Sequence, residues 1–426
     1  MANHDEEHPL SRGFYTILAA QFFSALADNA LLFAAIALLR SLDAPEWHTP
    51  VLQQGFVVAF IVLAPFVGPF ADALPKGRVM LIANTVKMLG CLAMLLGLHP
   101  LLSYGFVGVG AATYSPAKYG ILTECLPPRR LVWANAWMEG LTVAAIILGA
   151  IVGGLLIGQR VETEVLAGLR SLPYNAGIDT VPEFAIAAVM GFYVIAALFN
   201  LGIPALPIDH KPPQRTPWYL VKDFWSAFTQ LWKDPLGQVS LAVTTLFWGA
   251  GSTLRLIILV WAAAALHFDV ERATQLTAVV AVGIGIGASI AGKSVELAHA
   301  VRVLPVGVAM GLTVGAMVFV EDWRVAIALL MLIGGMGGYF VVPMNALLQH
   351  RGHQLMGAGH SIAVQNFNEN LSILTMLGAY ALMVKTGWTI DAIVIAFGAF
   401  VAGSMIWLNR VHGHDQDEPG RTGGGL

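Results

Sequence analysis

The sequence predicts an all-α membrane protein with twelve transmembrane helices in two six-helix, pseudo-symmetric halves. Three observations lead to this prediction: the composition, the number of long apolar segments, and a similarity between the two halves of the chain. Of the 426 residues, 57% are hydrophobic and only 12% are charged, whereas soluble domains carry about 25% charged residues. The mean hydropathy is +0.71. We therefore expect the chain to lie in a lipid bilayer.

The apolar segments are each about 20 residues long, the length that an α-helix needs to cross the hydrocarbon core. Only helices and closed barrels satisfy their backbone polar groups in lipid, and segments this long are not barrel strands. The expected spans are 14–39, 51–73, 79–98, 101–122, 131–158, 184–206, 238–266, 273–298, 303–320, 325–349, 357–385 and 388–409.

Basic residues in the connecting segments indicate the orientation. An even number of spans places both termini on one side of the membrane. That side receives most of the lysines and arginines, including Lys76, Arg78, Arg129 and Arg130. Because cytoplasmic loops carry the excess of positive charge, we expect both termini to be cytoplasmic.

The domain organisation follows from the longest polar interval between spans. Residues 1–206 are predicted to form an N-terminal six-helix bundle, and residues 237–410 a C-terminal one. Between them, residues 207–236 are predicted to form a cytoplasmic linker. Its segment WYLVKDFWSAFTQLW has the spacing of an amphipathic helix that lies in the membrane interface. Residues 411–426 are predicted to be a disordered tail.

The two halves are similar to each other. GVGAATYSPAKYGIL (108–122) and GGMGGYFVVPMNALL (334–348) both run from small residues through aromatics to a proline, and the prolines lie 227 positions apart (343 − 116). Parallel repeats with a substrate path between them are a known transporter architecture. The same offset pairs three further polar positions: Asp28 with Arg255, Lys118 with Asn345, and Glu139 with Asn366.

Asp28 is a carboxylate within the first span, QFFSALADNALLFAAIALL. A charge near the middle of a membrane helix costs about 2.5–3.5 kcal/mol on insertion scales, so Asp28 requires a partner or a water-filled cavity. A structural ion pair inside the bundle is one interpretation. We favour a functional one, because Arg255 is also intramembrane and would meet Asp28 near the central axis.

Further polar residues within the spans are candidates for a substrate path. Lys118 follows Pro116, which removes a backbone donor and disturbs its helix; ligand binding and snorkelling to the headgroup layer are about equally favoured. Gln365 and Glu369 share one helix face, and interhelical hydrogen bonding is the alternative for them. Lys87 is expected to be structural, by pairing or snorkelling. The predicted substrate-binding residues are Asp28, Asn29, Lys118, Glu139, Arg255, Asn345, Gln365, Asn366 and Glu369.

The loop GPFADALPKGRVM (68–80) joins the second and third spans. It loosely resembles the signature loop of the major facilitator superfamily, a charge cluster that is thought to latch the outward-facing state. Its spacing is longer, and Ala73 stands where a basic residue usually follows the aspartate. We expect Asp72 and Arg78 to act in gating.

Other chemistries find little support in the sequence. The histidines lack metal-ligand spacing, and no Walker A sequence is present, so we expect no metal, no cofactor and no ATP-driven step. GIGIGA (283–288) follows no strand and is expected to serve helix packing. Nothing indicates a nucleic-acid partner.

The predicted charges suggest a class of substrate. Asp28 offers an anionic contact, and Lys118 and Arg255 offer cationic ones. A zwitterion with an ammonium group and a phosphate would match both kinds of contact. The ammonium group pairs with the aspartate, and lysine and arginine are natural phosphate ligands.

Four segments carry a resemblance to a known family: AQFFSALADNALLFA, TLFWGAGSTLRL, GYFVVPMNALLQHRG and GAGHSIAVQNFNEN. With GVGAATYSPAKYGIL, they resemble the bacterial lysophospholipid transporters of the major facilitator superfamily, from about residue 13 to 410. The resemblance implies a flippase of the bacterial inner membrane that brings lysophosphatidylethanolamine, and also lysophosphatidylglycerol, to the inner leaflet without ATP or ion coupling. A separate acyl-carrier-protein-dependent acyltransferase on the cytoplasmic side would then re-acylate the product.

The family motifs map the critical membrane charges onto Asp28, Lys118 and Arg255. In this hypothesis, Asp28 holds the ammonium group while Lys118 and Arg255 hold the phosphate. Two alternatives stay open. An ion-coupled small-solute antiporter of the same fold would use Asp28 or Glu369 as its coupling carboxylate. A membrane enzyme acting on lipid would need a nucleophile–base pair or a metal, which the sequence does not offer, so we do not expect an enzyme.

Overall fold

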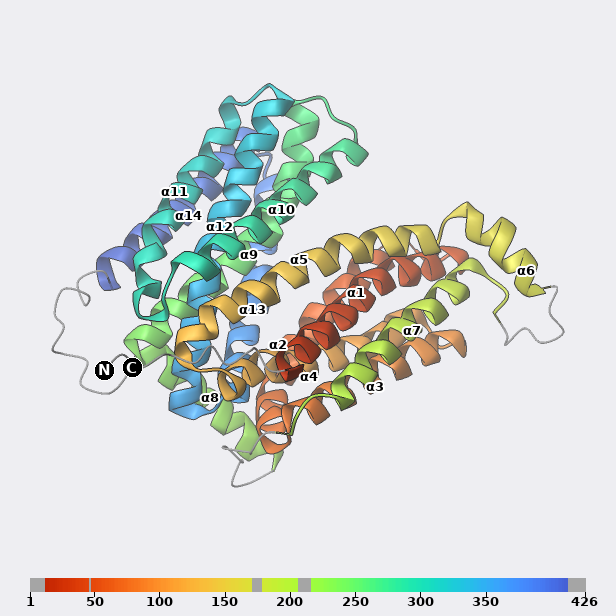
Figure 1. Cartoon of the computed structure of the whole chain (residues 1–426). Helices are drawn as coiled ribbons and strands as arrows, with labels where there is room; N and C mark the ends of the chain where they lie inside the picture. Colours follow the sequence, from red (N-terminus) through yellow and green to blue (C-terminus); the bar gives the residue numbers. More distant parts are fainter. Residues whose placement is uncertain (1–11, 46, 171–177, 206–215, 413–426) are drawn as a thin grey trace. The chain divides into compact units, whose positions relative to one another are not determined.

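The computed structural model describes residues 12–45, 47–170, 178–205 and 216–412, all in helices or short connections. The predicted tail lies outside these residues from position 413 onward, as does the start of the predicted linker, up to residue 215. The chain is drawn in Figure 1.

Within the described residues, a helix covers each of the expected spans. These helices are α1 (Arg12–Ser41), α2 (His48–Ala73), α3 (Lys76–Leu95), α4 (Pro100–Cys125), α5 (Leu131–Leu156), α7 (Val181–Leu201), α9 (Pro235–Ala265), α10 (Val270–Ser294), α11 (Leu304–Gly315), α12 (Trp323–Met356), α13 (Ala358–Lys385) and α14 (Ile390–His412). Short 3₁₀ turns, Leu297–Val303 and Ala316–Phe319, extend α11 at both ends. Two shorter helices are α6 (Ala167–Arg170) and α8 (Pro217–Lys233).

Ten helical segments in the described part of the chain are long and apolar enough to cross a membrane. The two remaining helices, α4 and α13, are also long but are not among these ten. Helix α4 carries Lys118 and Glu124, and α13 carries the cluster from Gln365 to Asn370. The protein is therefore a multi-pass membrane protein, and both α4 and α13 contain predicted site residues.

Small residues allow close helix packing, as expected in membranes. In α10, Gly283 and Gly287 face Gly334, Gly335 and the neighbouring backbone of α12, so closely that an added Cβ would meet backbone atoms. This is the packing that was predicted for the GIGIGA segment. Helix α9 begins at an N-cap, where Asp234 accepts a hydrogen bond from Gly237 N–H at 2.9 Å.

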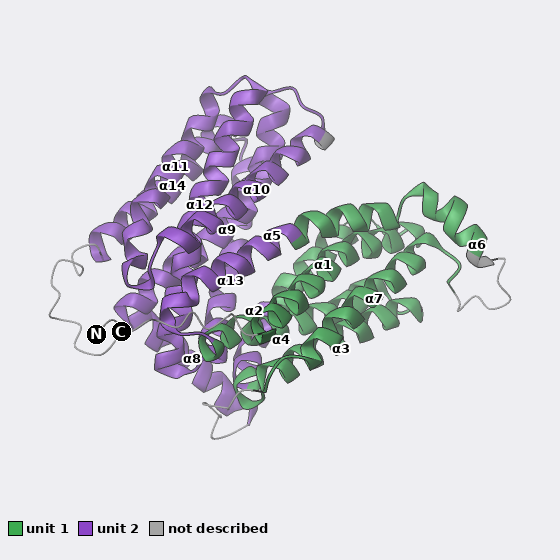
Figure 2. Ribbon diagram, viewed as in Figure 1, with its two compact units in different colours: residues 1–59, 70–125, 145–211 green, residues 60–69, 126–144, 212–426 purple. Residues whose placement is uncertain are grey.

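The chain divides into two compact units (Figure 2). Unit 1 contains residues 1–59, 70–125 and 145–211, and unit 2 contains residues 60–69, 126–144 and 212–426. In unit 1, α1 packs on α7, and α3 packs on α4 and α7. The domain boundaries at residues 206, 236 and 410 stay a prediction.

In unit 2, α8 is a strongly amphipathic helix next to the start of α9. Phe224, Ala227 and Leu231 are buried on one face and pack in a cluster with Leu241 and Leu348. The opposite face exposes Trp218 and Trp225, residues that favour the level of the lipid headgroups.

Candidate functional site

Asp28 is held by two hydrogen-bond donors inside unit 1. The Lys87 Nζ atom lies 2.7 Å from Asp28 Oδ2, and the Tyr193 hydroxyl donates to Asp28 Oδ1 at 2.6 Å. These three residues come from α3, α1 and α7. The carboxylate is thus both charge-paired and hydrogen-bonded, as an intramembrane charge requires.

The Lys87 ammonium group is buried in a polar and aromatic pocket. Its side chain is only 1% exposed, and Nζ also donates to Ser24 Oγ at 3.1 Å. The rings of Tyr114 and Tyr193 lie 4.9 and 5.5 Å from Nζ, within cation–π range. A Cβ at Gly110 would lie 2.6 Å from Lys87 Cγ, so only glycine leaves room there for the lysine stem.

Lys87 is a functional candidate that was not predicted from the sequence to be the partner of Asp28. The repeat offset instead related Asp28 to Arg255, which belongs to unit 2. Lys87 was expected to be structural, by pairing or snorkelling, and it does form an ion pair. The signal available in the sequence was a second intramembrane charge of opposite sign in a nearby span.

A second polar network lies in unit 2 and connects four predicted site residues. Gln365 Nε2 donates to Asn345 Oδ1 at 2.8 Å and to Glu369 Oε1 at 2.7 Å. Asn345 Nδ2 donates to Glu139 Oε1 at 3.4 Å. All four residues are buried. The fold therefore brings residues of α5, α12 and α13 into one buried chain of amides and carboxylates.

One turn before this network along α5, two amides form a reciprocal pair. Asn135 Nδ2 donates to Gln349 Oε1 at 2.9 Å, and Gln349 Nε2 donates to Asn135 Oδ1 at 2.8 Å. Sequence reasoning did not select either residue, because a single buried amide has no signature of its own.

The remaining predicted binding residues have separate surroundings. Asn29 Nδ2 donates to the carbonyl of Ala25 in its own helix, at 2.8 Å. The Lys118 ammonium lies 4.3 Å from the centroid of the Tyr119 ring. Arg255 is exposed on α9, and Asn366 is buried on α13.

The predicted gating residues do not share one contact. Asp72 Oδ1 lies 2.7 Å from Lys76 Nζ, which also lies 3.2 Å from Glu124 Oε1. Arg78 is exposed. The cation in this loop cluster is thus Lys76, which lies four residues after the aspartate. In the signature loop of the superfamily, the basic residue usually follows the aspartate directly.

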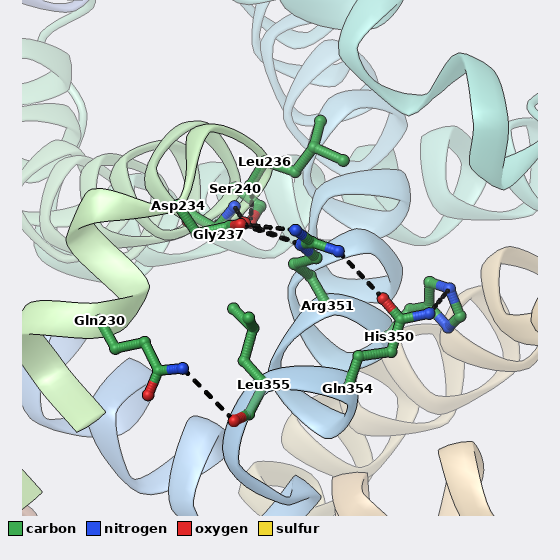
Figure 3. A network of polar contacts seen from close by, with 9 residues as sticks. All are labelled: Gln230, Asp234, Leu236, Gly237, Ser240, His350, Arg351, Gln354 and Leu355. Carbon is green, nitrogen blue, oxygen red and sulfur yellow. Dashed lines mark hydrogen bonds and ion pairs between the residues drawn. The ribbon is translucent and has the colours of Figure 1, made fainter. Parts of the chain in front are cut away.

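A bidentate ion pair joins the start of α9 to the end of α12 (Figure 3). The Arg351 guanidinium donates to both Asp234 carboxylate oxygens, with Nη2 to Oδ1 at 2.7 Å and Nε to Oδ2 at 2.9 Å. Burial raises the pKa of Asp234, but the hydrogen bonds from Arg351 and Gly237 N–H outweigh it, so the pKa lies below its ordinary value.

Helix α8 contacts the start of α13 and the end of α12. The His360 Nε2 atom lies 2.9 Å from Asp223 Oδ2, and Gln230 Nε2 donates to the carbonyl of Leu355 at 3.4 Å (Figure 3).

No cluster of three His, Cys, Asp or Glu side chains suited to a metal ion occurs in the described part of the chain.

Long apolar helices with paired intramembrane charges are typical of membrane transporters, and the known proteins that are similar to this chain belong to that class. Residues 17–374 match the Major Facilitator Superfamily. The chain is 45% identical over 379 residues to "Lysophospholipid transporter LplT" of Yersinia enterocolitica, covering 89% of each chain. It is also 45% identical over 377 residues to the protein of that name from Serratia proteamaculans, covering 88% of this chain and 89% of the relative. The chain belongs to the lysophospholipid transporter family of this superfamily.

Solved structures share the fold. The transporter FucP in its outward conformation aligns with a TM-score of 0.70 at 13% identity, over 94% of this chain and 98% of its own. The human organic anion transporter MFSD10 aligns with a TM-score of 0.68 at 14% identity, and the alignment covers 94% of this chain and 99% of MFSD10. At these identities the likeness concerns the fold alone.

Proposed function

We propose that the protein is a flippase that moves lysophosphatidylethanolamine, and also lysophosphatidylglycerol, from the outer to the inner leaflet of the bacterial inner membrane. Transport would proceed by alternating access without ATP. The observation that supports this most is the buried ion pair of Asp28 and Lys87, in a chain 45% identical to named lysophospholipid transporters. Both termini would be cytoplasmic, and a separate acyl-carrier-protein-dependent acyltransferase would re-acylate the product.

Asp28 would bind the ammonium group of the ethanolamine. An ionised carboxylate has about four lone-pair sites, and Lys87 and Tyr193 use one oxygen each. The Asp28 side chain is 22% exposed, so part of it stays accessible. Lys87 would act as a positioning residue, because it hydrogen-bonds Asp28 and balances its charge in a medium where an isolated charge is very costly.

Lys118 and Arg255 would bind the phosphate. Asp28 and Lys87 together carry no net charge, so Lys118 and Arg255 would supply the positive charge that meets the phosphate. Lysophosphatidylglycerol lacks the ammonium group and would depend on Lys118 and Arg255 more strongly. The exposure of Arg255 is consistent with access to a ligand.

The unit 2 network would line the path with hydrogen-bonding groups. Glu139, Asn345, Gln365 and Glu369 offer amide donors and carboxylate acceptors, and Asn366 and Asn29 add further amides. Asp72 would take part in gating through the contact with Lys76, and Arg78 is the second proposed gating residue.

Leaflet-resolved movement of labelled lysophosphatidylethanolamine in proteoliposomes tests the proposal, without any imposed ion gradient. Wild type should move the lipid, and Asp28→Asn should reduce the rate at least tenfold. Asp43→Asn, which changes an exposed aspartate just after α1, is the matched control and should keep the wild-type rate.

Other outcomes would identify the alternatives. Movement that requires a proton or sodium gradient would indicate an ion-coupled carrier. Chemical conversion of the labelled lipid by purified protein would indicate a membrane enzyme. An unchanged rate in Asp28→Asn would remove Asp28 from the path.

A further inference from the structure

A groove in unit 2 lies apart from every residue discussed so far as a headgroup ligand. It is formed by α9, α13 and α14, with α9 packed against both of the others. Its volume is about 710 Å³, within the range of about 300–1,000 Å³ that is usual for small-molecule sites. Most of its lining is apolar and includes Leu246, Leu371, Met376 and Phe400.

The groove opens onto the apolar surface of membrane-spanning helices. Leu371 is 44% exposed, Phe400 53% and Trp407 60%. Its walls extend over nine residues of α13 and nine of α14, and the eight steps between the first and the last correspond to about 12 Å at 1.5 Å per residue. Because these segments belong to helices that span the membrane, the medium that reaches the groove is lipid hydrocarbon.

The groove is also lined by two side chains whose polar atoms make no hydrogen bond with any residue that the structure describes. Trp232, from the last turn of α8, lines it together with Thr245 of α9. The Trp232 Nε1 and Thr245 Oγ1 atoms are buried, and neither makes a hydrogen bond with any residue that the structure describes. Buried polar groups without partners are uncommon and unfavourable. An oxygen-bearing ligand in the groove would supply a missing contact.

We propose that this groove binds the acyl chain of a single-chain phospholipid, with the glycerol oxygens next to Trp232. The chain would lie against Leu371, Met376 and Phe400. The free glycerol hydroxyl can accept a hydrogen bond, so it complements the Trp232 indole N–H. A two-chain phospholipid lacks that hydroxyl. This inference rests on the proposed function and assigns a place to the chain of its substrate.

The position of the groove has a consequence for selectivity. Lipid chains are as apolar as leucine, so moving a chain from the bilayer into the groove gives little free energy. Discrimination between one-chain and two-chain lipids would therefore come from the hydrogen bond to Trp232 and from the width of the groove between α13 and α14. Trp232→Phe keeps the ring and removes the N–H donor. It should weaken lysophosphatidylethanolamine binding about three- to tenfold, the usual range for one hydrogen bond.

A pair of glycine variants tests the site directly. Gly403 lines the groove, and an added Cβ there meets no atom within 4 Å. Gly403→Phe therefore fills the groove without displacing the backbone. Gly191 of α7 is also exposed and equally open, so Gly191→Phe is the matched control in unit 1.

The probe is lysophosphatidylethanolamine with a diazirine in its acyl chain, photolysed with the purified full chain in nanodiscs and mapped by mass spectrometry. We expect labels on α13 and α14 between Leu371 and Leu408, competed by unlabelled lysophosphatidylethanolamine but not by diacyl phosphatidylethanolamine. Gly403→Phe should lower the labelling at least fivefold, and Gly191→Phe should leave it unchanged.

Equal labelling of wild type and Gly403→Phe, or equal competition by diacyl lipid, would overturn the groove assignment. The proteoliposome assay judges the proposed function separately. Transport by wild type that depends on Asp28, without groove labelling, would leave the flippase proposal standing and refute this one.

Discussion

The Lys87 ammonium lies 2.7 Å from an Asp28 carboxylate oxygen, and the Tyr193 hydroxyl lies 2.6 Å from the other oxygen. Three membrane helices of unit 1 thus converge on one carboxylate. Lys87 is almost completely buried, whereas Asp28 retains some exposure. The lysine is positioned as an internal counter-ion, and the aspartate is the group that a ligand can still reach.

Removing the charge of Lys87 should destabilise the protein. Lys87→Met leaves Asp28 without its counter-ion, and breaking a buried pair costs about 3–5 kcal/mol. The partial exposure of Asp28 places the expected loss near the lower value. The thermal unfolding midpoint of the purified protein in detergent should fall clearly. The double variant Asp28→Asn/Lys87→Met should recover part of that loss; a double variant as unstable as the sum of the two single ones would contradict the pairing.

Tyr193→Phe should weaken the orientation of Asp28 while keeping the apolar core. A hydrogen bond to a charged group contributes about 1.5–3 kcal/mol, and the phenyl ring preserves the packing. We expect slower transport of lysophosphatidylethanolamine with a smaller change for lysophosphatidylglycerol, because only the former carries an ammonium group. Tyr104→Phe, in the same buried cluster, is the control. Equal slowing of both substrates would indicate a general packing defect.

Lys76 should matter more than Arg78 in the loop between α2 and α3. Lys76 lies between Asp72 and Glu124, at 2.7 and 3.2 Å. Lys76→Gln would leave two acidic groups close together without a cation, so the thermal midpoint and the transport rate should both fall. Arg78→Gln changes an exposed side chain and should leave stability within about 0.5 kcal/mol of wild type. If only Arg78→Gln slows transport, the basic gating residue is Arg78.

The Asp234–Arg351 pair should make stability depend on acid pH. The folded-state pKa of Asp234 lies below its ordinary value, so the pair stabilises the fold above the unfolded pKa of about 3.9. That contribution is lost as the pH falls through the lower folded-state pKa. Unfolding midpoints should therefore decline less steeply below pH 4 in Asp234→Asn than in wild type.

Asn is also a good N-cap residue, so Asp234→Asn separates the ion pair from the cap of α9. Asp234→Ala removes both and should be less stable than Asp234→Asn at neutral pH. Identical acid profiles for wild type and Asp234→Asn would show that the pair with Arg351 does not contribute.

The helices, the membrane class and the family follow from the sequence alone. Span length and apolar content are local properties, so each expected span coincides with a helix, including α13 despite its polar cluster. The motifs around Asp28, Pro116 and Asn366 were sufficient for the family because they occur as continuous segments.

The tertiary structure decided which polar side chains meet. Asp28 and Lys87 lie 59 residues apart, and their contact depends on which faces of α1 and α3 turn toward each other. The repeat offset related Asp28 to Arg255 by position, and a symmetric position does not specify a neighbour. The links among Glu139, Asn345 and Gln365, and the groove beside Trp232, likewise arise from helix packing. The length of an apolar segment is a property of the local sequence. Side-chain pairing, in contrast, depends on the relative rotation and depth of helices that are distant in sequence.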